Sequence, residues 1–542
     1  MILLIIDTTG IQSYVFGSNR LRDNIGASHL VALATTTGRP GSILDAALVA
    51  EKGVEVVYAG GGNAMLLLRE DAALHHVIAA VSRGALCGAP GLNLAYGWAR
   101  MEGDDGAAFE AAGEVAFARL DAQKRTFRPQ QTLLGLGVTA LCAATRQPAI
   151  GMFIEDNRPV LAAAEVLAKQ GVAADAHAAL RAAFPLADNA GAYRLDYPTD
   201  FDNLGRSEGE SSYIAVIHAD GDGMGKRIEA LLGRAYTSHA ESAMALSAFS
   251  SAVHGAMQGA LGAVVAHVCE AIGPDPKTGD PIVMAAPGST TTVHLKRTSN
   301  NGPYYVPLRP IIAAGDDVTM VCDGRLGLDL AVAYLQKFAE QADPNGEPFS
   351  ACAGVAIVNA HYPFAQAYAL ADDLCASAKA YRHSHGITGP CMDWHIATTG
   401  LGGTLTQMRE REYTGRRSSD GTPQRLELRP VALGDASAPL RSWETVRRGI
   451  NAFQGDTWQG RRGKAKALRE ALRGGSHAVD QFRASYLDGA LLDDIGAGDG
   501  VRETGYQEEY DAVEGLIARC GYFDALELMD LYVAPVSAGG RG

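Results

Sequence analysis

The sequence predicts an α+β fold in which helices cover antiparallel sheets, and it predicts that this arrangement occurs twice. Near the N-terminus an apolar run, residues 3–7, precedes a helical stretch and two apolar runs joined by the turn Gly60–Asn63. The same order of patterns returns from Tyr213 onward. A duplication determines the architecture, and this succession of strand, helix, hairpin, helix and strand is typical of a ferredoxin-like domain.

The first repeat is expected to span residues 1–130. Its predicted elements, in order, are a strand at 3–7, a helix at 11–36, strands at 54–59 and 64–68, a strand at 92–99 and a helix at 107–124. The two strands at 54–68 flank a glycine-rich turn, which is the pattern of a β-hairpin.

The second repeat, expected at residues 211–400, carries the same series. Its predicted elements are a strand at 213–219, helices at 224–232 and 241–271, a hairpin at 311–322, a strand at 349–358 and a helix at 364–381. Residues 273–301 are rich in Gly, Pro and Thr and are expected to form an inserted loop. A partly helical domain at 131–210, with helical spacing over 161–183, and a mostly helical domain at 401–542 complete the chain.

Composition narrows the class of protein. The 542 residues suffice for about three or four domains, and an apolar content of 47% supports packed cores. The net charge of −14 excludes general nucleic-acid binding through the bulk field, so such binding needs a local basic patch. The eight scattered cysteines favour reduced thiols in a cytoplasmic protein. The N-terminal apolar run is too short for a signal peptide, and no stretch is long and apolar enough to span a membrane.

One candidate basic patch lies in the C-terminal domain. Residues 441–469 hold eight basic residues against two acids, and residues 488–514 hold nine acids against Arg502. The basic stretch could follow a nucleic-acid backbone. It could also be a solvated helix face that pairs with the acidic stretch, and this second interpretation is slightly favoured.

Two apolar runs of the second repeat stop at acids and glycine. One is followed by Asp220, Gly221 and Asp222, and the other by Gly315, Asp316 and Asp317. If the two strands are adjacent, Asp220, Asp316 and Asp317 converge at one edge of the sheet and can hold two divalent cations for phosphoryl transfer. A Gly-Asp-Asp tripeptide alone is usually only a turn. The metal-binding interpretation is favoured because the first repeat has Gly62-Asn63 at its hairpin and lacks the paired acids, which indicates a catalytically silent repeat.

The residues after Asp220 suit an anion. Gly221, Gly223 and Gly225 let backbone amides approach a ligand, and a helix predicted to start at Met224 points its N-terminus the same way. Lys226 could add positive charge beside a triphosphate. The alternative is a tight glycine turn without a ligand. Lys379 stands late in a predicted helix, and taken alone it is expected to be a solvated residue or a complement of the helix dipole. No Ser-His-Asp arrangement, His/Cys metal spacing or Walker phosphate loop is evident.

These motifs resemble those of the polymerase-like large subunit of type III CRISPR effector complexes and, more distantly, of GGDEF diguanylate cyclases and class III nucleotidyl cyclases. In that family a silent palm domain precedes an active one. The matching segments are Ile11–Phe16 with Gly26–Leu30, Asp220–Gly225, Ala245–Ser247, the GGDD-like hairpin Ala314–Asp317, and Ala378–Lys379. The match covers roughly residues 1–400 at the level of motifs.

The resemblance implies condensation of ATP into cyclic oligoadenylate, an antiviral second messenger, with two Mg²⁺ or Mn²⁺ ions. It implies that Asp220, Asp316 and Asp317 are catalytic metal ligands and that a second group of residues binds nucleotide. That group comprises Ser28, Gly221, Asp222, Gly223, Met224, Gly225, Lys226, Ser247, Gly315 and Lys379. The implied partners are guide and target RNA and other effector subunits, or further copies of the chain if it acts alone, and no membrane.

Four departures from the family lead us to expect a divergent or stand-alone relative. Ala314 replaces the first glycine of the hairpin motif. No domain precedes the first palm, so we expect no HD nuclease and no DNA cleavage. The segment Cys142–Ala149 keeps one cysteine of the family's zinc site, and the insertion at 273–301 is unusual. Two alternatives remain: a non-catalytic palm-domain scaffold of an RNA-guided ribonucleoprotein, and a cyclic dinucleotide synthase that uses GTP or ATP.

Overall fold

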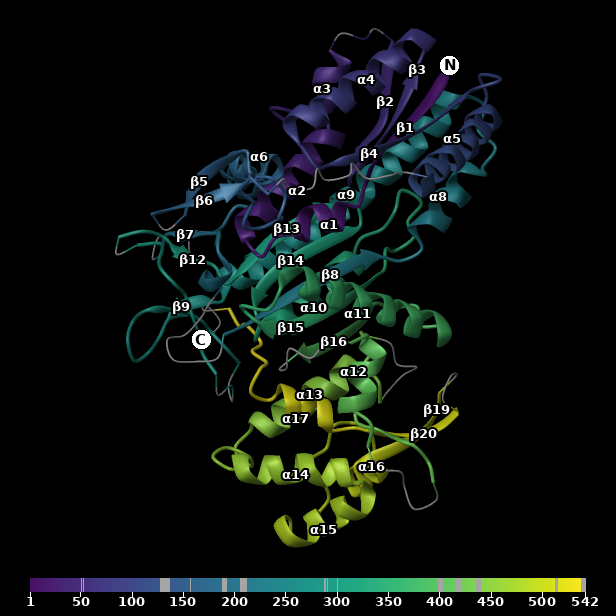
Figure 1. Cartoon of the computed structure of the whole chain (residues 1–542). Helices are drawn as coiled ribbons and strands as arrows, with labels where there is room; N and C mark the ends of the chain where they lie inside the picture. Colours follow the sequence, from purple (N-terminus) through teal and green to yellow (C-terminus); the bar gives the residue numbers. More distant parts are fainter. Residues whose placement is uncertain are drawn as a thin grey trace.

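The computed structural model of the chain describes residues 1–49, 51, 53–126, 137–155, 157–187, 193–204, 212–286, 289, 291–299, 301–397, 403–415, 421–434, 440–511 and 515–537. The first repeat lies at one end of the molecule, the second repeat in the middle and the C-terminal domain at the other end (Figure 1). The α+β class predicted from the sequence is confirmed.

The first repeat is built on a four-stranded antiparallel sheet in the order β2-β3-β1-β4. The strands are β1 (Ile2–Thr9), β2 (Val54–Gly60), β3 (Asn63–Leu68) and β4 (Asn93–Arg100), and the helices are α1 (Ile11–Phe16), α2 (Leu21–Thr35), α3 (Ile43–Leu48), α4 (Asp71–Gly88) and α5 (Gly106–Thr126). One face of the sheet packs on α5 and the other on α3 and α4. Because successive residues of a strand point to opposite faces, Asp7 shares the α5 face with Leu3 and Ile5.

The second repeat is built on a six-stranded sheet in the order β13-β14-β8-β15-β16-β18. The strands are β8 (Tyr213–Gly221), β13 (Leu308–Ala314), β14 (Asp317–Asp323), β15 (Ala351–Asn359), β16 (Cys391–Ala397) and β18 (Val431–Ala432), and the helices are α8 (Met224–Leu232), α9 (His239–Glu270), α10 (Gly327–Ala339) and α11 (Phe364–Ser384). Helices α9 and α10 cover one face and α11 the other. Asp220 therefore shares its face with the residues of β8 that lie under α11.

The two repeats share their topology down to an irregularity. The order β2-β3-β1-β4 is the order β13-β14-β8-β15, with a helix after each hairpin and another after each fourth strand. Each hairpin has a two-residue turn, and each first strand has a register shift at the same distance before that turn, at Val57 and at Ile311. The predicted duplication is therefore present in the register of the strands as well as in their order.

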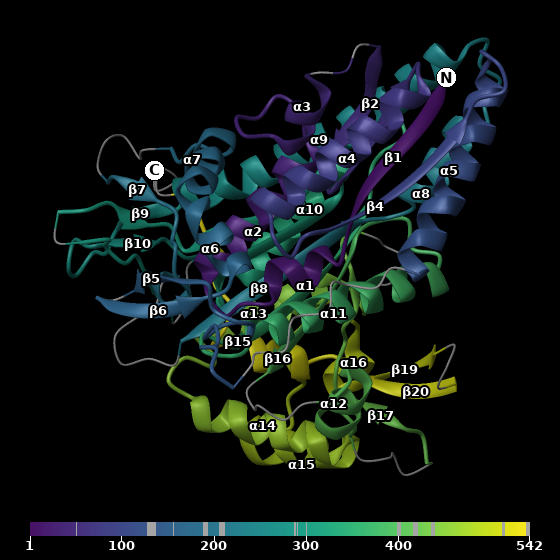
Figure 2. The same ribbon diagram turned by 45° about the horizontal axis from the view of Figure 1, so that its top comes forward.

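The repeats contact each other through helices and through their hairpin tips. Helix α9 packs against α5 and β2 of the first repeat and against α10 and β13 of the second. Helix α1 lies against α11 (Figure 2). Between these helices Phe16 stacks on Tyr368 with ring centroids 4.0 Å apart. A side chain added at Gly61 would lie 3.5 Å from the backbone nitrogen of Gly315, so the two turns face each other.

Contrary to the expectation from the sequence, helix α9 is long and apolar enough to cross a membrane, the one such helix among the described residues. Half of its apolar window, 50%, is buried inside the protein. Its contacts with both repeats are those of a core helix.

Several predicted elements need correction. The helix predicted at 11–36 is two helices, because the chain leaves helical geometry between Gly17 and the extended Arg20. Residues 273–301 are not simply a loop: β9 (Ile272–Pro274), β10 (Pro281–Val283) and β11 (Val293–His294) form a small sheet. Strands of two or three residues are too short to show an alternation of apolar and polar residues. The Gly and Pro content of the segment therefore led to the prediction of a loop.

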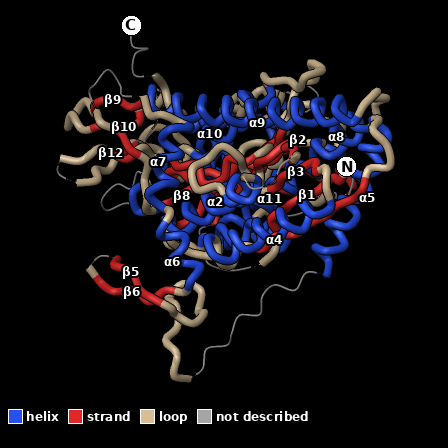
Figure 3. Tube along the Cα trace, turned by 90° about the horizontal axis from the view of Figure 1, so that it is seen from above, coloured by secondary structure: helices blue, strands red, loops and turns tan. Residues whose placement is uncertain are grey.

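The region between the repeats holds a projecting hairpin and two helices. Strands β5 (Gly151–Glu155) and β6 (Arg158–Ala162) extend away from the body of the molecule (Figure 3), and α6 (Ala164–Gly171) and α7 (Ala173–Ala183) replace the single predicted helix. Strand β7 (Leu195–Asp196) pairs with β12 (Tyr304–Tyr305).

The regular elements of the C-terminal region are mainly helices, and it also contains a small sheet. Its elements are α12 (Leu405–Glu412), α13 (Trp443–Gln454), α14 (Arg462–Gly474), α15 (Ser476–Tyr486), α16 (Asp499–Thr504), α17 (Phe523–Leu528), β17 (Gln424–Arg425), β19 (Tyr506–Asp511) and β20 (Gly515–Cys520). Strand β18 crosses the predicted boundary and extends the second sheet. The predicted domain boundaries at 130, 210 and 400 fall outside the described residues and stay predictions.

The basic stretch 441–469 makes ion pairs within the C-terminal region. Arg441 is buried and lies 3.6 Å from Glu509, which belongs to the acidic stretch. Arg447 and Arg448 bind Glu444 on their own helix, at 2.7 and 2.9 Å. The Arg441 contact agrees with the interpretation that the basic stretch pairs with the acidic stretch. The pairs of Arg447 and Arg448 with Glu444 lie within one helix and are typical of a solvated helix face.

Candidate active site

The three aspartates predicted to act together are neighbours at one edge of the second sheet. Strands β8 and β14 pair up to Ala219 and Val318. Asp220 and Asp317, the next residue outward on each strand, therefore lie opposite each other, at the separation of directly paired antiparallel residues, about 5 Å between Cα atoms. Asp316 precedes Asp317 in the turn of the hairpin.

Lys379 reaches this cluster from α11. Its Nζ donates to Asp220 Oδ2 at 2.5 Å and to the Gly221 carbonyl at 2.9 Å. Burial lowers the pKa of Lys379, but the Asp220 carboxylate outweighs burial and the pKa is raised, so the ammonium is charged. Of the two interpretations of Lys379, the structure excludes the solvated residue, since this side chain points at the acids.

Asp316 is the most perturbed carboxyl of the cluster. Burial, and then the charges of Asp220 and Asp317, raise its pKa to about 6. The crowding has a geometric counterpart, because a side chain at Gly221 would come within 2.7 Å of the Asp316 Cβ and Oδ2. Gly221 is therefore required for Asp316 to lie against the end of β8.

Asp317 faces a buried histidine. Its Oδ1 lies 3.4 Å from Nδ1 of His218, and Nε2 of the same ring lies 3.4 Å from Asp372 Oδ1 on α11. Burial lowers the pKa of His218, but its contact with Asp317 and the charges of Asp317, Asp372 and Asp220 raise it above the ordinary value.

The cluster suits divalent cations, although in this structure Lys379 lies against Asp220 and His218 lies against Asp317. Among the described residues no group of three or more His, Cys, Asp or Glu side chains has metal-site geometry, since Asp220 faces Lys379 and Asp317 faces His218. Asp317 Oδ1 is nevertheless buried without a hydrogen bond, and Asp316 is held against like charge. Both features fit hard oxygen ligands for Mg²⁺ or Mn²⁺. The metal assignment of Asp220, Asp316 and Asp317 stays a prediction.

The glycine turn after Asp220 has the predicted form but a different use of Asp222. Gly223, with φ of 71°, caps α8 with its left-handed backbone, and Met224, Gly225 and Lys226 form the first turn of that helix. Asp222 is held by Arg382 and by His383, whose Nε2 lies 3.1 Å from Asp222 Oδ1. Asp222 thus fixes the end of α11 relative to the turn, and its contact with nucleotide stays a prediction.

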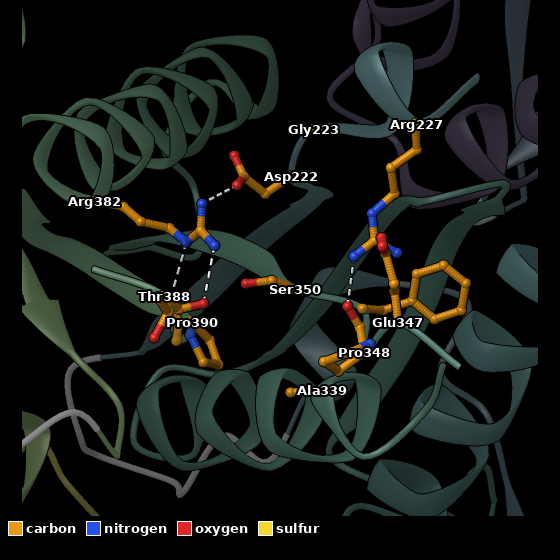
Figure 4. Close-up of a pocket in the computed structure, with 12 residues that line it drawn as sticks. Asp222, Gly223, Arg227, Ala339, Glu347, Pro348, Ser350, Arg382, Thr388 and Pro390 are labelled. Carbon is orange, nitrogen blue, oxygen red and sulfur yellow. Dashed lines mark hydrogen bonds and ion pairs between the residues drawn. The ribbon is translucent and has the colours of Figure 1, made fainter. Parts of the chain in front are cut away.

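A pocket of about 570 Å³ opens beside this turn. Asp222, Gly223 and Arg382 line one side of it and Arg227 lies across from them, with Ser350 between (Figure 4). The Ser350 hydroxyl and the Nη1 atom of Arg227 are buried without hydrogen-bond partners. The pocket therefore offers donors beside the predicted phosphate-binding turn.

The remaining predicted residues are more dispersed. Ser247 lies on α9, which covers the face opposite α11, and Ser28 lies on α2, which packs against β13. Gly315 adopts φ of 62° in the turn that faces Gly61. No contact joins either serine to the aspartates, and the predicted roles of all three residues remain untested.

The first repeat retains part of this arrangement. Asp7 occupies the place of Asp220, pairs with Lys124 of α5, and lies opposite Asn63. The two lysines are equivalent by packing. Side chains at Gly97 and Gly354 would lie 2.1 and 2.0 Å from the carbonyl oxygens of Ala116 and Ala371, and Lys124 and Lys379 follow those alanines at the same spacing.

Comparison with known proteins agrees with this geometry. Residues 213–387 match the family described as Cas10/Cmr2, second palm domain. The second repeat is Cas10-like. It is thus a palm domain of the kind found in the large subunit of type III CRISPR complexes, which has a nucleotidyl cyclase-type fold. A search of curated proteins finds no match.

Solved structures with a similar fold are Csm1 proteins. A Csm1–Csm4 cassette in complex with pppApApA is 15% identical, and the match covers 98% of this chain and 69% of that chain with a TM-score of 0.50. Csm1 in T. onnurineus is 14% identical over 98% of this chain and 69% of that chain, with a TM-score of 0.48. An apo Csm1–Csm4 cassette is 15% identical over 70% of this chain and 53% of that chain, with a TM-score of 0.41. At these identities the likeness concerns the fold.

The sequence reasoning missed His218, Arg382 and His383. His218 is one imidazole inside an apolar strand, a signal that could have been read as a polar residue placed two positions before Asp220. Arg382 and His383 follow Lys379 by about one helical turn, but their partner Asp222 is distant in sequence, so only the fold brings them together.

Proposed function

We propose that the chain is a metal-dependent nucleotidyltransferase that condenses ATP into cyclic oligoadenylate. In this reaction the 3′-hydroxyl of one ATP attacks the α-phosphate of another, a P–O bond forms, and pyrophosphate leaves. The observation that carries the proposal is the crowding of three carboxylates at the end of β8, with the pKa of Asp316 raised to about 6 by burial and by Asp220. Such crowding is common at catalytic sites and is relieved by a divalent cation.

Each residue then has a role. Asp220, Asp316 and Asp317 would hold two Mg²⁺ or Mn²⁺ ions, which activate an attacking oxygen and steady a leaving one. Lys379 is placed to leave Asp220 for a phosphate oxygen once metal neutralises the carboxylate, because its ammonium is already at the cluster. The amides from Gly221 to Gly225 and the N-terminus of α8 would receive the triphosphate.

The arrangement of the repeats supports a shared nucleotide site. The Gly61 and Gly315 turns face each other, so a second nucleotide bound at the first repeat would be presented to the aspartates. By analogy with the Csm1–Csm4 assemblies, we propose that a type III effector complex holding guide and target RNA is the setting for this activity. Further copies of the chain are the alternative if it acts alone.

Labelled ATP tests the proposal directly. Purified full-length chain, with Mn²⁺ or Mg²⁺, should release pyrophosphate and form cyclic oligoadenylate, with the partner subunits and target RNA added if the chain alone is inactive. The double variant Asp316→Ala/Asp317→Ala should lose at least about 1,000-fold in rate, about 4 kcal/mol in barrier, while unfolding at a temperature close to that of the wild type.

Two other functions would give different results. A non-catalytic scaffold would give no product under any of these conditions, although it would still assemble with partners. A cyclic dinucleotide synthase would form a two-nucleotide ring, and competition among the four nucleoside triphosphates would show whether GTP replaces ATP.

A further inference from the structure

His218 lies immediately behind the predicted metal ligands. It is two residues before Asp220 on β8, so both side chains project from the same face of the strand. Its exposed fraction is 4%. A residue this deeply buried cannot touch substrate, so any effect on the reaction has to act through a neighbour.

The histidine ring is enclosed by carboxylates and by α11. Nδ1 lies 3.4 Å from Asp317 Oδ1, and also 3.4 Å from the Thr319 hydroxyl, while Nε2 lies 3.4 Å from Asp372 Oδ1. Tyr368 of α11 packs edge-on against the ring with centroids 5.4 Å apart. The ring therefore points one nitrogen at the hairpin and the other at the helix.

A glycine lets the helix come close enough for these contacts. Gly354 pairs with His218 across β8 and β15. A side chain at Gly354 would lie 2.0 Å from the Ala371 carbonyl oxygen of α11. The close approach of α11 at Gly354 brings Asp372, the next residue of the helix, over the histidine.

The first repeat, which lacks the hairpin acids, has different residues at the positions of His218 and Thr319. Ile5 stands at the place of His218, since it pairs with Gly97 as His218 pairs with Gly354. Met65 pairs with Ile5, where Thr319 pairs with His218. The repeat that has Asn63 in place of Asp317 thus has an apolar pair in place of His218 and Thr319. The fold itself therefore does not need His218 and Thr319.

We propose that His218 is a positioning residue for Asp317: its Nδ1, 3.4 Å from Asp317 Oδ1, orients this carboxylate toward a bound cation. The inference rests on the proposed function, because it requires Asp317 to be a metal ligand. Residues that orient metal ligands from behind typically change metal affinity by about 10–100-fold when they are removed. Asp372 would fix the ring from its far side.

Metal affinity separates this role from a purely structural one. We expect His218→Ile, which copies the first repeat, to weaken Mn²⁺ binding by about 10–100-fold in calorimetric titrations of the full chain. His218→Asn keeps a donor near the position of Nδ1 and should retain much of the affinity, whereas His218→Gln places its donor near Nε2, toward Asp372, and should not. At saturating Mn²⁺ the KM for ATP of the three variants should be close to that of the wild type.

The controls make each outcome decisive. His76→Ile, an equal chemical change at a histidine with a 70% exposed side chain on α4, should leave Mn²⁺ affinity unchanged. If His218→Ile binds Mn²⁺ as tightly as the wild type, or if Asn and Gln variants lose affinity equally and only in proportion to lost thermal stability, the positioning role is wrong. If the wild type itself binds no Mn²⁺ with or without ATP, the proposed function fails, and this inference fails with it.

Discussion

The two repeats of this chain have the same strand order, the same bulged hairpin and the same lysine–aspartate pair, yet only one carries a cluster of acids. Asp7 and Lys124 reproduce Asp220 and Lys379, but Gly62 and Asn63 stand where the second repeat has Asp316 and Asp317. The difference separates two sets of requirements. The glycine under the helix belongs to the fold, since both repeats have it. The lysine–aspartate pair is also common to both repeats, but only in the second repeat does it lie beside the hairpin acids and His218, which the proposed chemistry requires.

The largest expected difference between the repeats is in nucleotide transfer. Asp220→Asn should lower the rate of pyrophosphate release by at least about 1,000-fold, because it removes a metal ligand. Asp7→Asn should lower it by less than about 10-fold, because Asp7 has no second carboxylate opposite it and cannot hold a metal pair. Equal losses in the two variants would show that the first repeat is not silent.

Substitution of Lys379 should also reduce activity more than substitution of Lys124, but the difference should be smaller than for the two aspartates. Lys379→Met should reduce kcat/KM for ATP by about 10–100-fold, the range of one charge-assisted hydrogen bond to phosphate. Lys124→Met should change kcat/KM by only a few-fold, and it should lower the free energy of unfolding by about 1–2 kcal/mol, because it leaves the half-buried Asp7 carboxylate unpaired. Steady-state kinetics and chemical denaturation of both variants would check this. A kinetic loss at Lys124 as large as that at Lys379 would give the first repeat a phosphate contact.

Most elements of both repeats and the position of the acids could be predicted from the sequence, because each depends on a local pattern. These patterns are apolar runs ended by Gly and Asp, and turns that need glycine. The sequence did not indicate the partners of those acids. His218 lies in an otherwise apolar strand, and its contacts Asp317 and Asp372 come from a hairpin and a helix far along the chain. Asp222 is held by Arg382 and His383, two contacts that no local pattern indicated, and its role with nucleotide stays a prediction. Long-range pairing of this kind, like the short strands within 273–301, is decided by tertiary structure.

The glycines under α5 and α11 should be needed equally in both repeats. An alanine at Gly97 or Gly354 would place a methyl group about 2 Å from a helix carbonyl, so each substitution should cost about 2–3 kcal/mol of stability, as overpacking typically does. Gly113→Ala, on α5 with open space around it, is the matched control and should stabilise by about 0.5–1 kcal/mol. Thermal unfolding of the three variants measures the difference. If Gly354→Ala alone destabilised, the packing equivalence of the two helices would be wrong.

The smallest expected effect is on the free energy of unfolding, which the crowded carboxylates of the second hairpin lower. The pKa of Asp316 is raised to about 6 in the folded chain from an ordinary value of 3.8, so the folded state binds its proton more tightly than the unfolded state does. The contribution of Asp316 to stability is therefore largest below pH 3.8, falls as the pH rises to about 6, and stays lower above that. In metal-free buffer at pH 7, Asp316→Asn should raise the free energy of unfolding by about 1–2 kcal/mol, and the gain should vanish below pH 4.

The first repeat offers the reverse substitution. Asn63→Asp would create a carboxylate opposite Asp7, in the arrangement of Asp220 and Asp317. It should lower stability at pH 7 by about 1 kcal/mol or less, because Lys124 remains beside Asp7, and it should be neutral near pH 3. Denaturant titrations across pH 3–8 measure both changes. A gain from Asp316→Asn that did not depend on pH would mean that packing, and not crowded charge, distinguishes the two hairpins.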